Sequence, residues 1–175
     1  MIYLEKGLLV IRDMEPADIP QIVQGEIEQG WENASAEKYE MRLRHRAEGR
    51  AIPLTAVYDG QAVGYINVYP DSPWGAFGGQ GLPEIVDFGV LEKYRCHGIG
   101  SALMDTAEAV AGQYADTVYL GVGLHSGYGS AQRMYVKRGY IPDGSGVWYG
   151  DAVCEPYSTC ANDDSLALYL SKKLR

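Results

Sequence analysis

The sequence has few cysteines, a minority of basic residues and no long apolar run, and each shortage excludes a class of protein. No stretch approaches the roughly 18 consecutive apolar residues of a membrane-spanning helix. The three cysteines, Cys96, Cys154 and Cys160, do not make a disulfide framework in a chain of 175 residues. The 15 Lys and Arg residues are outnumbered by 23 Asp and Glu residues, and the net charge of −8 argues against binding to nucleic-acid phosphates. We therefore predict a protein that binds neither nucleic acid nor membrane.

The remaining composition predicts one cytoplasmic domain over residues 1–175. The N-terminal stretch "MIYLEKGLLVIRDMEP" lacks the basic region and cleavage site of a signal peptide. The histidines are scattered, and the Cys154–Cys160 spacing differs from that of zinc sites, so we predict no metal. The acidic charge is compatible with a cationic substrate such as an amine, although solubility alone accounts for it.

The apolar patterns predict a mixed α/β chain without internal repeats or linkers. Strands are expected at residues 8–12, at the two runs of "LTAVYDGQAVGYINVYP", and at 84–91, 117–124, 147–149 and 165–174. Helices are expected after Pro16, at 36–48, from 99 to 110 and over 129–138. The hairpin around the Asp59-Gly60 turn implies that part of the sheet is antiparallel.

The stretch "YRCHGIGSAL" places one arginine and two glycines between a predicted strand and a predicted helix. Such a turn leaves unpaired backbone N–H groups at the start of the helix, where anions bind. Gly98 and Gly100 have no Cβ, so a bulky phosphate can approach the backbone closely. Arg95 adds a permanent cation that can bond two phosphate oxygens at once. The stretch therefore predicts a site for a phosphate-bearing ligand, and we expect a diphosphate.

The same residues carry a family resemblance. Residues 95–100, "RCHGIG", resemble the Arg-x-x-Gly-x-Gly motif of the GNAT superfamily of acetyl-CoA-dependent N-acetyltransferases, which binds the pyrophosphate of coenzyme A. The segments "IRDMEPADIPQIV", "VYDGQAVGYI", "EIVDFGV" and "AQRMYVKRGY" follow that family in order and spacing, so the resemblance covers roughly residues 8–141 and the last strand. It implies an α/β fold of the α+β type, with a mixed, mostly antiparallel sheet of about six or seven strands flanked by about four helices.

The resemblance also implies that acetyl-CoA is the co-substrate. The residues expected to bind it are Phe88, Gly89, Val90, Arg95, Cys96, His97, Gly98, Ile99, Gly100 and Ser101. Gly89 is expected to mark a strand bulge beside the backbone N–H groups that bind the thioester. Cys96 stands where the family often has a glycine, and Tyr128 stands where it often has a coenzyme-contacting asparagine. His97 is expected to face solvent.

Acetyl transfer to an amine also needs an acid for the leaving thiolate and a base for the amine. The resemblance implies that Tyr135 is the acid, because its helix matches the family's Ala-x-x-x-Tyr followed by a glycine and an aromatic residue. It implies that Glu84 is the base, as in the histone-acetylating branch, and half-burial at a strand end would raise its pKa toward neutrality. Asp87 and deprotonation through water are the alternatives. Simple strand alternation puts Glu84 on the same face as Phe88, with Asp87 on the other face.

The acceptor amine is expected between the loop 71–81 and the segment 148–164. These segments contain aromatic and acidic side chains that can hold an ammonium group: Trp74, Phe77, Trp148, Tyr149, Tyr157, Asp71, Asp151, Glu155, Asp163 and Asp164. Acidic surface is the simpler interpretation of the same residues. Small amines, amino-bearing antibiotics, and protein or peptide N-termini or lysines all stay open as acceptors, and so does a homodimer.

Two other functions compete with direct acetyl transfer in a ternary complex. One is a non-catalytic acyl-CoA-binding sensor or scaffold, which the presence of Tyr135 disfavours. The other is NAD binding by "LGVGLHSGYG", but its glycine spacing is one residue too long and it lacks a preceding βαβ unit.

Overall fold

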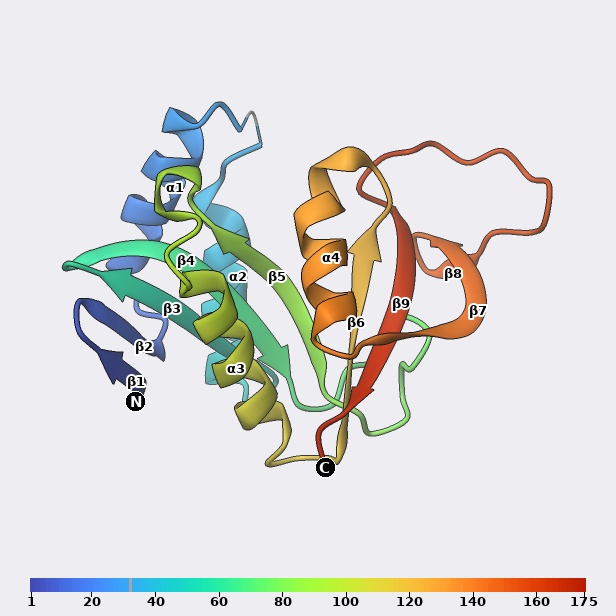
Figure 1. The fold of residues 1–175 in the computed structure, drawn as a ribbon, viewed down its shortest axis with the longest axis horizontal. Helices are drawn as coiled ribbons and strands as arrows, with labels where there is room; N and C mark the ends of the chain where they lie inside the picture. Colours follow the sequence, from blue (N-terminus) through green and yellow to red (C-terminus); the bar gives the residue numbers. More distant parts are fainter. Residues whose placement is uncertain (32) are drawn as a thin grey trace.

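The computed structural model describes residues 1–31 and 33–175, which form a mixed sheet with helices on both faces (Figure 1). The strands are β1 (Ile2–Lys6), β2 (Leu9–Asp13), β3 (Ile52–Tyr58), β4 (Gln61–Tyr69), β5 (Glu84–Val90), β6 (Thr117–Gly123), β7 (Ile141–Tyr149), β8 (Ala152–Val153) and β9 (Leu166–Lys173). The helices are α1 (Asp18–Glu28), α2 (Ala36–Ala47), α3 (Ile99–Ala111) and α4 (Gly129–Lys137), with short 3₁₀ turns η1 (Glu92–Tyr94) and η2 (Ser126–Tyr128).

The sheet order is β1-β2-β3-β4-β5-β6-β9-β7-β8, and the β5–β6 pair is parallel while the other neighbours are antiparallel. The predicted α+β class and mostly antiparallel sheet are therefore confirmed. The described part of the chain has nine strands rather than the six or seven predicted. The difference comes mainly from β1 and β8, edge strands that lie at the two ends of the sheet order.

Two apolar clusters fill the two faces of the sheet. The larger cluster joins the sheet to α3 and α4 through residues such as Ile66, Leu103 and Tyr135. The smaller one joins it to α1 and α2 through Ile22 and Tyr39. The sheet therefore separates an α3/α4 face from an α1/α2 face (Figure 1).

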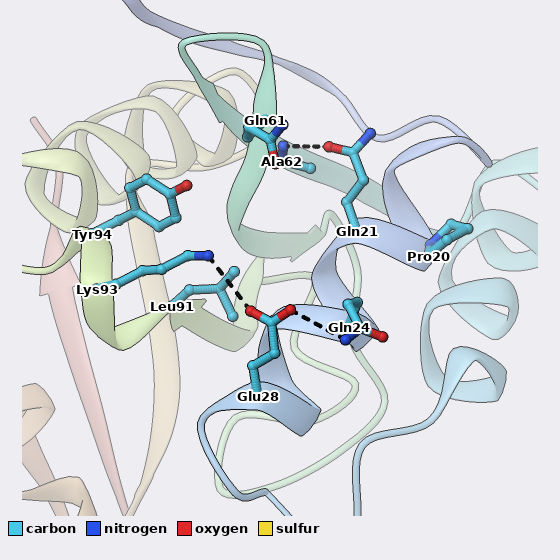
Figure 2. Close-up of a pocket in the computed structure, with 10 residues that line it drawn as sticks. Pro20, Gln21, Gln24, Glu28, Gln61, Ala62, Leu91, Lys93 and Tyr94 are labelled. Atoms are coloured by element: carbon cyan, nitrogen blue, oxygen red, sulfur yellow. Dashed lines mark hydrogen bonds and ion pairs between the residues drawn. The ribbon is translucent and has the colours of Figure 1, made fainter.

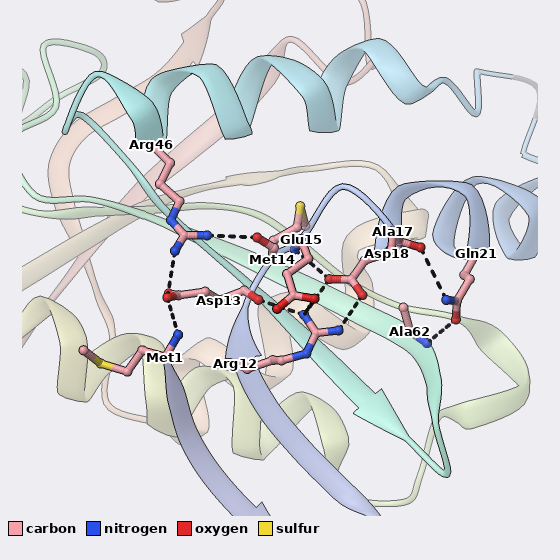
Figure 3. A network of polar contacts seen from close by, with 10 residues as sticks. All are labelled: Met1, Arg12, Asp13, Met14, Glu15, Ala17, Asp18, Gln21, Arg46 and Ala62. Carbon is pink, nitrogen blue, oxygen red and sulfur yellow. Dashed lines mark hydrogen bonds and ion pairs between the residues drawn. The ribbon is translucent and has the colours of Figure 1, made fainter.

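A polar network fixes both helices of the α1/α2 face to the end of β2 (Figure 3). The Arg12 guanidinium donates to both carboxylate oxygens of Asp18, at 2.7 and 2.8 Å. Asp18 also accepts from the backbone N–H of Glu15 at 2.8 Å. Asp13 accepts from Arg46 of α2 at 2.8 Å and from the chain's N-terminal ammonium at 2.6 Å. The network sets the position of α2, which carries residues described below.

The strands β5 and β6 pair only at Glu84 and Tyr119 and then diverge. Figure 1 shows the two strands separating toward their C-terminal ends, next to α4. The backbone N–H of Tyr119 donates to the Pro83 carbonyl at 3.1 Å, which ties the two strands together just before β5 begins. Beyond Glu84, therefore, β5 has no sheet partner on its β6 side among the described residues.

Candidate active site

The turn before α3 has the geometry expected of an anion site. Gly98 caps the helix with φ of +78°, and Cys96 also has a positive φ of +63°. Within the described ranges, no residue accepts a hydrogen bond from the backbone N–H groups of residues 96–101. These donors and the helix dipole together form a site for negative charge.

The residues predicted to bind the phosphates differ in whether their side chains or only their backbone could contact a ligand. Arg95 is half-exposed and bonds the Val90 carbonyl at 3.3 Å and Glu92 at 3.2 Å, so its guanidinium is beside the turn. His97 is exposed, as predicted, with Nδ1 2.7 Å from the Arg95 carbonyl oxygen. Ile99 is buried in the core, so only its backbone could face a ligand, whereas Ser101 is exposed.

Replacing Cys96 with glycine is expected to raise the free energy of unfolding by about 0.5–1 kcal/mol, because a left-handed backbone strains a residue with a Cβ. Cys96→Ala, which keeps the Cβ, serves as the control and should show no gain. Urea unfolding of the three proteins measures the difference. If the glycine and alanine variants are equally stable, the backbone of residue 96 is unstrained.

Three elements meet at Gly100, next to the divergence of β5 and β6. A Cβ at this glycine would lie 3.2 Å from Cζ of Phe88 on β5 and 3.5 Å from Cε of Met134 on α4. The predicted cofactor strand, the glycine turn and the tyrosine helix therefore converge. A Cβ here would be tight against the Phe88 ring, so glycine suits the close packing of the first turn of α3 against the other two elements.

Tyr135, the predicted acid, lies on α4 directly after Met134. Its side chain is only 6% exposed and belongs to the larger apolar cluster. Burial raises the pKa of Tyr135, so the hydroxyl carries its proton at neutral pH. A protonated hydroxyl can donate a proton to a ligand.

Glu84, the predicted base, is buried at the point where β5 and β6 separate. Its side chain is 5% exposed, and Oε2 accepts a hydrogen bond from Ser72 Oγ at 2.5 Å. Burial raises the pKa of Glu84 to about 7, although the Ser72 bond and the nearby Arg42 charge act in the opposite direction. A carboxylate with this pKa can accept a proton near neutral pH.

The bulge in β5 lies at Asp87, and the prediction that Gly89 marks it is wrong. Between two paired positions, β4 advances from Tyr65 to Asn67 while β5 advances from Val86 to Gly89, which leaves one extra residue on β5. Asp87 has a φ of +50° and supplies the irregular backbone. Gly89 is instead needed because the Tyr65 ring would lie 2.8 Å from a Cβ at this position.

The bulge also reverses the predicted faces of β5. Phe88 and Val90 pack with Ile85 in the cluster under α3, whereas the charges of Asp87 and Arg42 act on Glu84. Glu84 therefore lies on the α1/α2 face with Asp87, not on the face of Phe88 and Val90. The prediction assumed uninterrupted alternation, and the extra residue shifts the pattern by one.

Asp87, the alternative base, is held by a guanidinium. Arg42 of α2 donates to Asp87 Oδ2 through Nε at 2.9 Å and also through Nη2. The same side chain donates to the Tyr69 hydroxyl, which lies 2.6 Å from Nδ1 of His45. The Asp87 carboxylate is thus bound by a guanidinium, whereas the Glu84 carboxylate accepts from the neutral Ser72 hydroxyl.

Only part of the predicted acceptor set lies near Glu84. The rings of Phe77 and Tyr119 are 5.1 Å apart, and those of Trp148 and Tyr169 are 5.3 Å apart. Tyr119 also donates to the Trp74 carbonyl at 2.7 Å, which holds the loop 71–81 beside the strand partner of Glu84. Aromatic rings therefore line the sheet next to the predicted base.

Two of the acidic residues of the last segment, Asp163 and Asp164, have structural partners instead. Asp164 accepts from the Tyr128 hydroxyl at 2.8 Å and lies 2.9 Å from His125 Nε2, while Asp163 accepts from Tyr149 at 2.9 Å. Tyr128, the departure from the family's asparagine, thus connects the start of α4 to the segment before β9. Tyr157 is fully exposed.

Several residues around the site were not predicted from the sequence: Arg42, Asn67, Tyr69, Ser72, Tyr119 and Tyr169. A signal existed for Asn67, because residues 62–69 of β4 are otherwise glycine, apolar and aromatic residues. The others depend on long-range pairing of strands and loops.

A cavity of about 320 Å³ lies away from this site, between α1, the start of β4 and η1 (Figure 2). Its polar side chains bond one another: Gln24 donates to Glu28 at 3.1 Å, and Lys93 lies 3.6 Å from Glu28. Gln21 accepts from the Ala62 N–H at 2.9 Å. No residue predicted to bind a substrate lines it.

The described residues contain neither a cluster of metal ligands nor a helix that could span a membrane. No three potential ligands gather among residues 1–31 and 33–175, although the Cys154 and Cys160 sulfurs lie 2.7 Å apart. No helix in this part of the chain is long and apolar enough to cross a membrane.

Comparison with known proteins agrees with this geometry. Residues 17–140 match the acetyltransferase (GNAT) family. The chain therefore belongs to this family, which confirms the resemblance carried by the turn before α3.

One curated relative is similar in sequence. An N-alpha-acetyltransferase of Sulfurisphaera tokodaii is 36% identical over 110 residues, which are 58% of this chain and 64% of that protein. The chain thus matches less than two thirds of that relative's length.

Solved structures share the fold. Ard1 from Thermoplasma volcanium has a TM-score of 0.69 at 22% identity, covering 97% of this chain and 99% of that one. The Salmonella typhimurium acetyl transferase that modifies the N-terminal serine of ribosomal protein L7/L12 has a TM-score of 0.73 at 10% identity, with complete coverage of both chains, 100% each. At these identities the likeness establishes the fold alone.

Proposed function

We propose that the protein transfers an acetyl group from acetyl-CoA to a primary amine, directly and within a ternary complex. The observation that carries the proposal is the convergence of β5, the glycine turn and α4 at Gly100, where β5 and β6 separate. The free N–H groups of residues 96–101 and Arg95 would hold the pyrophosphate. The divergence beside Phe88, Gly89 and Val90 would take the pantetheine and thioester.

The proposed base and the proposed acid lie on opposite faces of the sheet, beside the acceptor and the acetyl donor respectively. Glu84, on the α1/α2 face, would take a proton from the attacking ammonium or amine. Tyr135, on the α3/α4 face, would donate its proton to the departing thiolate. Backbone N–H groups at the β5 bulge would stabilise the negative charge that develops on the thioester oxygen.

The acceptor proposed for first testing is the α-amino group of a protein or peptide N-terminus. The name of the Sulfurisphaera relative supports this choice. The rings beside Glu84 suit the approach of an ammonium group, which is attracted to aromatic faces. We place the reaction in the cytoplasm and leave the choice between monomer and homodimer to measurement.

The test is thermal unfolding with and without acetyl-CoA, with NAD as the control ligand, followed by CoA release with peptides and small amines. At a hundred times its Kd, acetyl-CoA should add about 2.7 kcal/mol of stability and shift Tm by several degrees. No shift with acetyl-CoA, or an equal shift with NAD, would refute the assignment of the turn. No CoA release with any amine, despite binding, would favour the non-catalytic acyl-CoA-binding alternative.

Replacing Arg95 with alanine is expected to weaken acetyl-CoA binding by about 10- to 100-fold, the usual value of hydrogen bonds to a charged group. The matched control is Arg50→Ala. The side chains of the Arg95–Glu92 pair are 49% and 53% exposed, and those of the Arg50–Glu48 pair are 50% and 54% exposed. Calorimetric titration should find wild-type affinity for the control, and equal losses in both variants would contradict a phosphate contact by Arg95.

A further inference from the structure

The bulge of β5 is held in place by side chains from two other elements. Asp87 adopts its positive φ without being a glycine, so the surrounding structure must stabilise an unfavourable backbone. On one side, Arg42 of α2 binds the Asp87 carboxylate. On the other side, Asn67 of β4 lies in register with Val86, directly beside the extra residue.

Asn67 bonds two successive carbonyl groups of the bulge. Its Nδ2 lies 3.4 Å from the carbonyl oxygen of Val86 and 3.4 Å from that of Asp87. The side chain is 1% exposed, and Oδ1 has no partner among the described residues. A buried amide whose only side-chain bonds are to these two carbonyls has a specific role at the bulge.

The directions of the two carbonyl groups determine the directions of two N–H groups. In a trans peptide the C=O and the following N–H point in opposite directions within one plane. In a regular strand, successive carbonyls alternate between the two neighbouring strands. Here the carbonyls of Val86 and Asp87 both point toward Asn67 on β4, so the N–H groups of Asp87 and Phe88 both point toward β6.

These N–H groups face the place where β6 has moved away. The β5–β6 pairing ends at Glu84, so no strand partner is available to them on that side within the described ranges. Two adjacent donors that point the same way form the arrangement that stabilises a developing oxyanion.

We infer that Asn67 is a positioning residue for acetyl transfer: by binding the Val86 and Asp87 carbonyls, it directs the Asp87 and Phe88 N–H groups at the thioester oxygen. The inference rests on the proposed function. Asn67 does not touch the substrate. It acts through the backbone of β5, which makes kcat more sensitive to it than acetyl-CoA affinity.

The test uses Asn67→Leu and Asn67→Ser, with Thr55→Val as the matched control. Both Asn67 variants remove the amide, and serine keeps the position small and polar if a buried leucine hinders folding. Thr55 lies on β3, is fully buried, and its hydroxyl has no partner among the described residues. Its replacement thus alters a buried polar side chain of the same sheet without touching the bulge.

We expect either Asn67 variant to lower kcat about 10- to 100-fold, part of the value of an oxyanion donor, while Kd for acetyl-CoA changes by less than about threefold. The second readout is the infrared carbonyl stretch of acetyl-CoA labelled with carbon-13 in the acetyl carbonyl. Binding should move this band to lower wavenumber in the wild type and in Thr55→Val, and by less in the Asn67 variants.

A folded Asn67 variant with wild-type kcat, or with reduced kcat but the full carbonyl shift, would overturn the inference. So would failure of both variants to fold, because Asn67 would then be a structural residue. If the wild type itself neither binds acetyl-CoA nor releases CoA, the proposed function fails first, and this result is distinguishable because it appears before any variant is made.

Discussion

Replacing Glu84 with glutamine is expected to lower kcat/KM above pH 7 by a factor on the order of 10² to 10⁴, the range of general acid–base catalysis. Glutamine keeps an oxygen that can accept the Ser72 hydrogen bond but cannot take a proton. Because burial raises the pKa of Glu84 to about 7, wild-type kcat/KM should fall about tenfold per pH unit below that value. In the variant, kcat/KM should not show this fall at acidic pH (the acidic limb of the pH profile).

The matched control is Glu26→Gln. Glu26 is 1% exposed and accepts hydrogen bonds from Tyr39 at 2.5 Å and Tyr65 at 3.0 Å, which a glutamine oxygen can also accept. Its substitution removes a buried carboxylate without removing the proposed base. If both variants lose activity equally, or if Glu84→Gln keeps the acidic limb, Glu84 is not the base and water-mediated deprotonation becomes the better explanation.

Glu84→Gln is expected to lower activity but to raise the free energy of unfolding, by an amount that depends on pH. The folded state binds the Glu84 proton more tightly than the unfolded state, because the pKa rises from 4.5 to about 7 on folding. The contribution of Glu84 to wild-type stability therefore decreases as pH rises from 4.5 through 7. At pH 8 the free energy of unfolding of Glu84→Gln should exceed that of the wild type by on the order of 3 kcal/mol. The difference should vanish below pH 4.5, where the wild-type carboxyl is protonated in both states. Urea unfolding across this pH range measures it.

Replacing Tyr135 with phenylalanine is expected to lower kcat by a factor on the order of 10² to 10⁴, with little change in Kd for acetyl-CoA. Only the hydroxyl is removed, and the ring that packs in the larger apolar cluster is kept. The free energy of unfolding should therefore change little.

The chain provides a close control in Tyr140→Phe. Tyr140 is 2% exposed, its ring centroid lies 5.8 Å from that of Tyr135, and its hydroxyl has no partner among the described residues. Single-turnover measurement of CoA release should find wild-type rates for this control. A Tyr135→Phe enzyme with full turnover would remove the assigned acid, and loss of acetyl-CoA binding in that variant would indicate a structural role.

The features that could be predicted from the sequence are those determined by local interactions. The turn around Gly98 and Gly100, the strand before it and the amphipathic α3 depend on residues close together in the chain, and all were found where expected. The helix 36–48 was also predicted to within one residue of α2. Glu84 could be selected because a family pattern places a carboxylate at that distance from Arg95.

The bulge could not be placed, because its cause lies outside its own strand. A lone aspartate gives no reason for a positive φ, whereas Gly89 gives an obvious one. The backbone at Asp87 is stabilised by Arg42 and Asn67, which are 45 and 20 residues away in sequence. For the same reason the face of Glu84 was predicted wrongly, since one irregular residue changes the side on which its neighbours lie.

The sheet separates the two sides of the molecule like a partition. Because β5 and β6 pair at a single point and then diverge, there is a gap in this partition between them. Phe88 and Tyr135 border that gap from the α3/α4 side, and Glu84 borders it from the α1/α2 side. Under the proposed function, donor and acceptor reach the gap from opposite sides of the partition. Neither substrate then blocks the route of the other, and an acceptor as large as a protein chain end can enter or leave while the acetyl donor stays in place.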